Sequence, residues 1–141
     1  MKRLKLIIAG LALVLTGVVN AQVAVTIGTP PPWGPAEASG IRFYYLPDIQ
    51  MYFDVNSGEY VYYSGGSWVH TRELPHAYRH YDLYNAYKVP LRDYHGEKPW
   101  ENHRDYHKNY PKGYHKDEHQ KTFGERPDHD NHGHDDHHDK H

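Results

Sequence analysis

The residues best suited to chemistry lie in the segment 128–141, which reads DHDNHGHDDHHDKH. Six of these residues are histidine and five are aspartate. Neutral imidazole with carboxylate suits Zn²⁺, Ni²⁺, Cu²⁺ or Co²⁺, and the absence of cysteine removes the thiolates of Cu(I) and iron–sulfur sites. The segment therefore predicts binding of divalent transition metal ions. The expected ligands are His129, His132, His134, His137, His138, His141, Asp128, Asp130, Asp135 and Asp136.

The same segment permits a simpler interpretation, in which it only solubilises the protein and buffers charge. It contains no apolar side chain, so burial cannot offset the entropy lost on ordering, and we expect a disordered tail in the absence of a ligand. Metal affinity would then be incidental. In both interpretations, metal is not required for the rest of the chain to fold.

Two further histidine pairs have the spacing of neighbouring helical turns. Pro99 predicts the start of a helix that ends before Pro111, and His103 and His107 stand four residues apart on it. The same spacing recurs at His115 and His119, so each pair has the spacing to bind one divalent ion. The competing interpretation is that His103 and His107 pack on a neighbouring sheet, because aromatic residues flank them on the same helical face.

The sequence gives no indication of catalysis. It has no cysteine nucleophile, no Gly-x-Ser-x-Gly turn, no phosphate-binding loop and no His-Glu-x-x-His pair. Its histidines and acids lie mostly in segments without the rigid elements that acid–base catalysis requires. We therefore do not expect an enzyme.

The elements that must position these residues begin with an aromatic stretch, residues 41–71. Apolar and polar residues alternate along it with a period of two, which predicts half-buried strands with one apolar face. Pro47 limits the first strand, and a turn at residues 56–58 and a second at Gly65 and Gly66 complete the division into four antiparallel strands. Residues 76–87 fit either a helical face or irregular 3₁₀ turns. The expected fold is α+β, a small β-meander with one or two short helices.

Three aromatic residues, Trp33, Trp68 and Tyr62, are candidates for binding a partner. Trp33 lies in residues 29–35, whose prolines predict an extended polyproline segment. Trp68 and Tyr62 belong to predicted strands, where large aromatics offer a flat apolar surface to a protein or a glycan. The alternative, which we favour for each, is packing on their own domain.

The N-terminal residues 1–21 are typical of a secretory signal peptide. Three basic residues precede the apolar run 6–19, and small side chains at Val19 and Ala21 predict cleavage after Ala21. An uncleaved membrane anchor is the alternative; no other segment predicts a membrane span. Loss of the three basic residues from 16 leaves 13 against 18 acidic residues, a formal charge of −5 with histidine neutral, so nucleic acid is not an expected partner. The predicted divisions are a signal peptide 1–21, a proline-rich extended segment 22–40, a folded domain 41–115 and a disordered tail 116–141.

Several short motifs lie between residues 22 and 126, namely Trp33-Gly-Pro35, Tyr44-Tyr-Leu-Pro47, Leu74-Pro75, Tyr81-Asp-Leu-Tyr84, Tyr87-Lys-Val89, Asp93-Tyr94 and Lys112-Gly-Tyr114. Together they resemble those of a group of short, uncharacterised exported proteins from Gram-negative bacteria. The resemblance covers residues 22–126 and implies a periplasmic or envelope location, with one domain from the meander to Tyr114. The group has no established activity, and its tails vary between basic, glycine-rich and histidine-rich.

Together these patterns predict a periplasmic or secreted small protein that binds or buffers divalent transition metal ions through its histidine- and aspartate-rich tail. The alternative is a structural or interaction protein of the cell envelope that recognises a protein or glycan surface through exposed aromatics.

Overall fold

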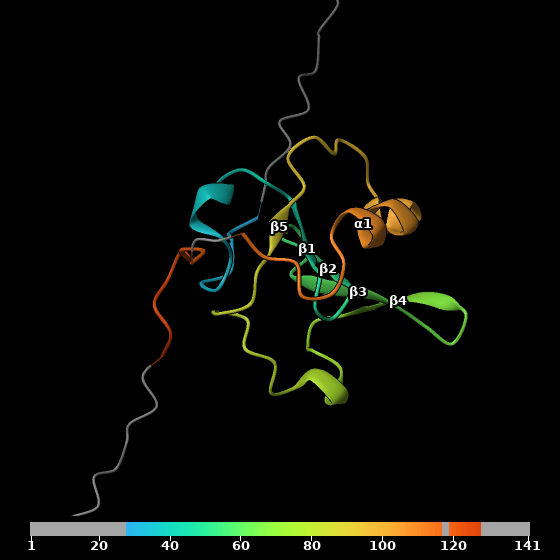
Figure 1. Ribbon diagram of the computed structural model, residues 1–141, viewed down its shortest axis with the longest axis horizontal. Helices are drawn as coiled ribbons and strands as arrows, with labels where there is room; N and C mark the ends of the chain where they lie inside the picture. Colours follow the sequence, from blue (N-terminus) through green and yellow to red (C-terminus); the bar gives the residue numbers. More distant parts are fainter. Residues whose placement is uncertain (1–27, 117–118, 128–141) are drawn as a thin grey trace, which may run out of the picture.

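A computed structural model describes residues 28–116 and 119–127 (Figure 1). Within these residues the chain forms an antiparallel five-stranded sheet in the order β4-β3-β2-β1-β5, together with short helices. The α+β class with a β-meander is therefore confirmed. The strands are β1 (Phe43–Leu46), β2 (Met51–Asp54), β3 (Glu59–Ser64), β4 (Ser67–Thr71) and β5 (Val89–Pro90). The helices are the 3₁₀ turns η2 (Ala36–Ala38), η3 (His76–Tyr78) and η4 (Pro99–Asn102), and the α-helix α1 (His103–Asn109).

Glycines make the two predicted hairpin connections possible. Gly58 follows β2 with a φ of +69°, and Gly65 and Gly66 join β3 to β4 with φ of +59° and +86°. Two successive residues with positive φ are typical of a type I′ turn, whose twist matches that of the flanking strands. The turn sets the register of this hairpin, in which Tyr63 lies opposite Trp68.

The central strands β1 and β2 are buried on both faces of the sheet, so the expectation of a single apolar face is wrong. Every residue of β1 and β2 is buried. Tyr44 and Phe53 belong to the cluster on one face, and Tyr45 and Tyr52 belong to the cluster on the other. The period-two alternation is present, but both of its faces carry tyrosines that other segments cover.

Different parts of the chain cover the two faces (Figure 1). Leu74, Tyr78, Tyr81 and Leu83 pack on the cluster that contains Tyr44. The segment 99–114 covers the opposite face, with Trp100 buried and the tyrosines of this segment packed beside it. Residues 76–87 contain only the 3₁₀ turn η3, so irregular turns, and not an α-helix, are found there.

The helix predicted between Pro99 and Pro111 is present as η4 followed directly by α1. Pro99 occupies the first turn of η4, where its missing N–H costs no hydrogen bond. In residues 28–116 and 119–127, no helix has the length and apolarity needed to cross a membrane. The predicted signal peptide and residues 128–141 of the tail lie outside the described residues.

Residues before and after the meander pair with each other and extend the folded unit beyond the expected range 41–115. Pro35 and Thr122 form an isolated antiparallel bridge. The amide of Ala36 donates to the carbonyl of Lys121 at 2.9 Å, and the amide of Phe123 donates to the carbonyl of Gly34 at 2.9 Å. The expected extended conformation of residues 29–35 is also interrupted, because the amide of Gly34 donates to the carbonyl of Pro31 at 2.8 Å and closes a turn.

Candidate functional site

The described part of the chain contains four of the predicted histidine ligands and all three predicted partner-binding aromatics. The ten predicted ligands between Asp128 and His141 lie outside it. These four histidines form two pairs, one on α1 and one after it, and the surroundings of the two pairs differ.

His103 and His107 lie on successive turns of α1, above the sheet. Their ring centroids are 6.0 Å apart and their planes differ by 26°. Nδ1 of His103 is 3.0 Å from the hydroxyl of Tyr52, and its ring also meets Trp68 edge-on at 5.2 Å. Burial, with a smaller contribution from His107, lowers the pKa of His103 below its usual value. This pKa favours the neutral ring, which is the form that binds metal.

His107 has a hydrogen bond that opposes metal binding. The side-chain amide nitrogen of Gln50 donates to Nδ1 of His107 at 2.7 Å. Since a neutral imidazole carries one proton, acceptance at Nδ1 places that proton on Nε2, so neither nitrogen of His107 has a free lone pair. The two histidines of α1 therefore hold the helix on the sheet, and chelation would require the Gln50 side chain to turn away. Among the described residues, no three His, Cys, Asp or Glu side chains come together in a group that could hold a metal ion.

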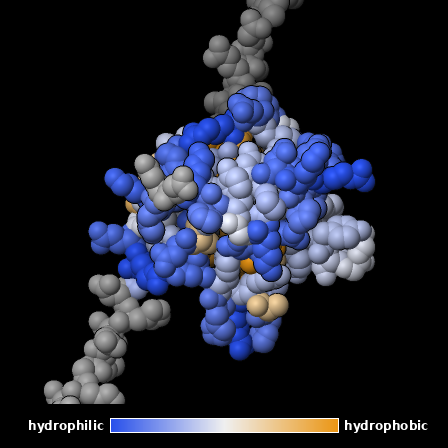
Figure 2. Space-filling model, viewed as in Figure 1, coloured by the Kyte–Doolittle hydropathy of each residue, from blue (hydrophilic) through white to orange (hydrophobic). Residues whose placement is uncertain are grey.

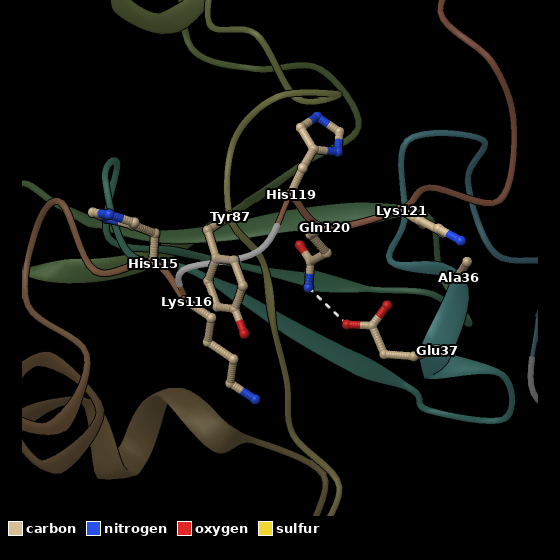
Figure 3. A pocket seen from close by; sticks show the side chains of 8 residues that line it. All are labelled: Ala36, Glu37, Tyr87, His115, Lys116, His119, Gln120 and Lys121. Carbon is tan, nitrogen blue, oxygen red and sulfur yellow. Dashed lines mark hydrogen bonds between the residues drawn. The ribbon is translucent and has the colours of Figure 1, made fainter.

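His115 and His119 line a hollow of about 820 Å³ beside η2 (Figure 3). Their rings point in different directions, and neither residue belongs to a helix. Nδ1 of His115 lies 2.8 Å from the carbonyl of Gly113, to which it donates. Lys116 and Lys121 do not point toward each other either.

One wall of the same hollow is tied to the core through Gln120. Its side-chain nitrogen donates to Glu37 Oε1 at 2.8 Å and to the carbonyl of Lys88 at 2.9 Å (Figure 3). Its side-chain oxygen accepts the amide of Lys88 at 2.9 Å. Gln120 thus fastens the segment after His119 to the chain beside β5, which is a structural role.

The three predicted partner-binding aromatics do not form one surface. Trp33 meets Phe53 edge-on at 4.7 Å and stacks on Tyr60 at 6.1 Å, so it packs on its own domain. Tyr62 packs on the same cluster, whereas Trp68 packs on the cluster of the opposite face. A partner could not contact all three at once.

Two features of the folded unit are not predicted by the sequence patterns. Tyr63 is 59% exposed and meets Trp68 at 5.3 Å, at the end of the β3–β4 hairpin. Its position two residues before Gly65, close to the turn, is the signal that could indicate its exposure. Lys88 is fully buried, with Nζ donating to the carbonyl of Leu83 at 2.8 Å. Burial lowers the pKa of Lys88 to about 8, although the more distant Glu37 and Asp82 partly offset this shift.

Comparisons with protein-family models, with curated proteins and with solved structures found no match to this chain. A function must therefore be inferred from the chain's own residues and their geometry.

Proposed function

We propose that this is an exported protein that binds or buffers divalent transition metal ions through residues 128–141. The observation that carries the proposal is the composition of this segment, six histidines and five aspartates with no apolar side chain. Several pairs, such as His129 and His132, or His137 and His141, are three or four residues apart. Short spacings let two imidazoles reach one ion while aspartates supply oxygen ligands.

The folded unit supports this proposal by what its own histidines do. His107 accepts a hydrogen bond from Gln50, and His115 is hydrogen bonded to a backbone carbonyl. The rings of His115 and His119 do not converge (Figure 3). These contacts make His107, His115 and His119 poor competitors for an ion, so we assign the main binding capacity to the segment 128–141.

The folded unit also supplies a fixed point from which this segment begins. The amide of Gly124 donates to the carbonyl of Pro32 at 2.8 Å, and Thr122 pairs with Pro35. The tail therefore begins shortly after a strand-like segment that is anchored to the domain. In this proposal the sheet domain is the carrier and the tail is the ligand-binding part.

The alternative role as an envelope protein that binds a protein or glycan is less well supported. Trp33 and Tyr62 contribute to the core on one face of the sheet, and Trp68 contributes to the other. No single surface of the described residues presents the three together.

Calorimetric titration with Zn²⁺, Ni²⁺ and Cu²⁺ tests the proposal. Three proteins are compared: residues 22–141, residues 22–127, and residues 22–141 with the six tail histidines replaced by asparagine. We expect the first to bind and the other two to lose most of the binding. A His103→Gln, His107→Gln double variant is the matched control and should bind like the first protein.

Equal metal stoichiometry in residues 22–141 and 22–127 would contradict the proposal. It would transfer the site to the folded unit, and the double variant would then show whether α1 holds it.

A further inference from the structure

The end of the β3–β4 hairpin extends beyond the rest of the sheet (Figure 1). Among the residues that the structure describes, β2 pairs with β3 only along residues 59–61, so Tyr62, Tyr63 and Ser64 have β4 as their only strand neighbour there. β4 itself ends the sheet order, and within residues 28–116 and 119–127 it has a strand neighbour on one side only. A two-stranded arm of this kind is only marginally stable alone, and pairing with an additional strand increases its stability.

The register of the hairpin fixes which backbone groups of β4 are free. Ser64 and Ser67 flank the two-residue turn and form a hydrogen-bonded pair, after which bonded and non-bonded pairs alternate. Val69, opposite Tyr62, therefore directs its N–H and C=O toward β3. Trp68 and His70 direct theirs away from the sheet, which leaves a row of two donors and two acceptors along the open edge.

β4 lacks the features that usually protect an open edge. Its five residues, Ser67 to Thr71, include no proline, lysine, arginine, aspartate or glutamate. The opposite edge, β5, is only two residues long and includes Pro90. In the part of the chain that the structure describes, β4 is thus the longer edge and the one open to pairing.

The amino-acid composition at the end of the β3–β4 hairpin also favours contact between two copies of this end. Tyr63 is 59% exposed and meets Trp68 at 5.3 Å. In Figure 2 the side chains where the hairpin projects are nearly white, whereas strongly hydrophilic side chains dominate the neighbouring surface. Two such ends can approach without repulsion between like formal charges, because β4 contributes none with His70 neutral.

We propose that two copies of this chain associate through antiparallel pairing of β4 with β4, centred on Val69. With this centre, Trp68 of each copy lies opposite His70 of the other. The outward donors and acceptors of both residues then match, which gives four hydrogen bonds about a two-fold axis. The two Val69 side chains meet at the axis as a closely spaced, non-hydrogen-bonded pair, with Cα atoms about 4.5 Å apart. The result is a continuous sheet through both copies, and it does not depend on the proposed metal binding.

Charge exchange at Val69 tests this geometry in the mature full-length chain. Val69→Lys places two ammonium groups at the axis and Val69→Glu places two carboxylates there, so each variant alone should be monomeric. An equimolar mixture should form a heterodimer, because lysine then faces glutamate. Molar masses come from light scattering after size exclusion, in metal-free buffer at concentrations up to about 0.5 mM; the unaltered chain should show twice the monomer mass.

A monomeric mass for the unaltered chain over this whole range would overturn the proposal. So would dimers of undiminished stability in both single variants, since another surface would then hold the copies together. If either variant fails to fold, hydrogen exchange of the unaltered chain decides. Protection of the Trp68 and His70 amides should rise at least tenfold between dilute and concentrated protein, and unchanged protection would exclude the pairing.

Discussion

Gln50 donates its side-chain amide to Nδ1 of His107 at 2.7 Å, and it does so from a left-handed backbone conformation with a φ of +54°. Gln50 is the only described non-glycine residue with positive φ. It stands in the turn between β1 and β2, so this contact fastens α1 to the end of the first hairpin. A conformation that L-residues rarely adopt is thus retained where the side chain docks a helix.

We predict that Gln50→Ala lowers the free energy of unfolding by about 1 kcal/mol, the usual net value of one hydrogen bond. Gln50→Gly is the matched control, because glycine removes the same bond but adopts positive φ without strain. It should therefore be more stable than the alanine variant. Urea unfolding followed by tryptophan fluorescence measures both, and equal stability of the two variants would show that the backbone at Gln50 carries no strain.

Two of the tryptophans, Trp100 and Trp68, are predicted to differ in their contribution to stability. Trp100 is 7% exposed and contacts Phe43 and Tyr52 edge-on, so Trp100→Ala should cost about 3–5 kcal/mol. Trp68 is only partly buried, and its replacement by alanine should cost less. From the sequence alone, Trp68→Ala is predicted to cost about 3–5 kcal/mol if the indole is buried. Chemical unfolding of both variants checks the order, and a larger loss for Trp68 would contradict it.

Local patterns predicted much of the central fold. The period-two alternation and the glycine turns located all four strands of the meander, and Pro99 marked the start of η4. The burial of both faces of the central strands was not predicted. Tyrosine suits both a buried and an exposed position, and the alternation assigns Tyr44 and Tyr52 to the solvent-exposed face. Strand β5 has two residues and ends in proline, so no periodicity could indicate it.

Contacts between distant parts of the sequence explain the remaining differences. Gly34 and Phe123 are joined by a backbone hydrogen bond, yet each segment by itself resembles a linker. Likewise, the spacing of His103 and His107 is visible in the sequence, but their hydrogen bonds to Tyr52 and Gln50 reach over 50 residues back along the chain. A pattern in sequence can supply two candidate ligands, whereas only the fold shows which ring nitrogens are already occupied.

Lys88 provides a prediction on pH. Burial lowers the pKa of its ammonium to about 8 in the folded protein, from an ordinary value near 10.5. The ammonium of Lys88 is less favourable in the folded than in the unfolded state. The destabilisation caused by Lys88 is therefore absent above pH 10.5 and develops as pH falls toward 8. Between pH 8 and 10, therefore, stability should increase with pH, with a contribution of up to about 3 kcal/mol from Lys88 over its full range.

Buried tyrosines have the opposite effect at still higher pH. Burial raises the pKa of Tyr44, Tyr45 and Tyr60 to about 12, so their stabilising contribution is lost as pH rises above about 10. Stability should pass through a maximum near pH 10. Lys88→Met should remove the rise between pH 8 and 10 and keep the fall above it, as measured by urea unfolding at each pH. A rise of the same size in Lys88→Met would show that Lys88 does not cause it.

The tail 128–141 is predicted to bind metal without changing the stability of the folded unit. It has no apolar side chain with which to pack, so its removal should leave the metal-free unfolding midpoint nearly unchanged. Binding of Zn²⁺ to the tail should weaken below about pH 6.5, where protons compete for the imidazole nitrogens. Calorimetric titration of residues 22–141 at several pH values measures this loss, and binding that is independent of pH would contradict ligation by imidazole.

Metal-dependent thermal unfolding distinguishes the two places where the chain could hold an ion. A segment that binds metal equally in the folded and unfolded protein does not shift the unfolding equilibrium, because linkage requires a difference in affinity between the two states. Binding to His103 and His107 requires α1, which exists only in the folded state, and it would raise the unfolding temperature.

We predict that saturating Zn²⁺ changes the midpoint of residues 22–141 by less than about 1 °C. Scanning calorimetry with and without Zn²⁺ makes the comparison, with Gln50→Ala as a variant that frees Nδ1 of His107. A Zn²⁺-dependent rise of several degrees in the unaltered protein would assign the site to the folded unit, and a rise only in Gln50→Ala would show that the hydrogen bond from Gln50 is what keeps His107 from binding.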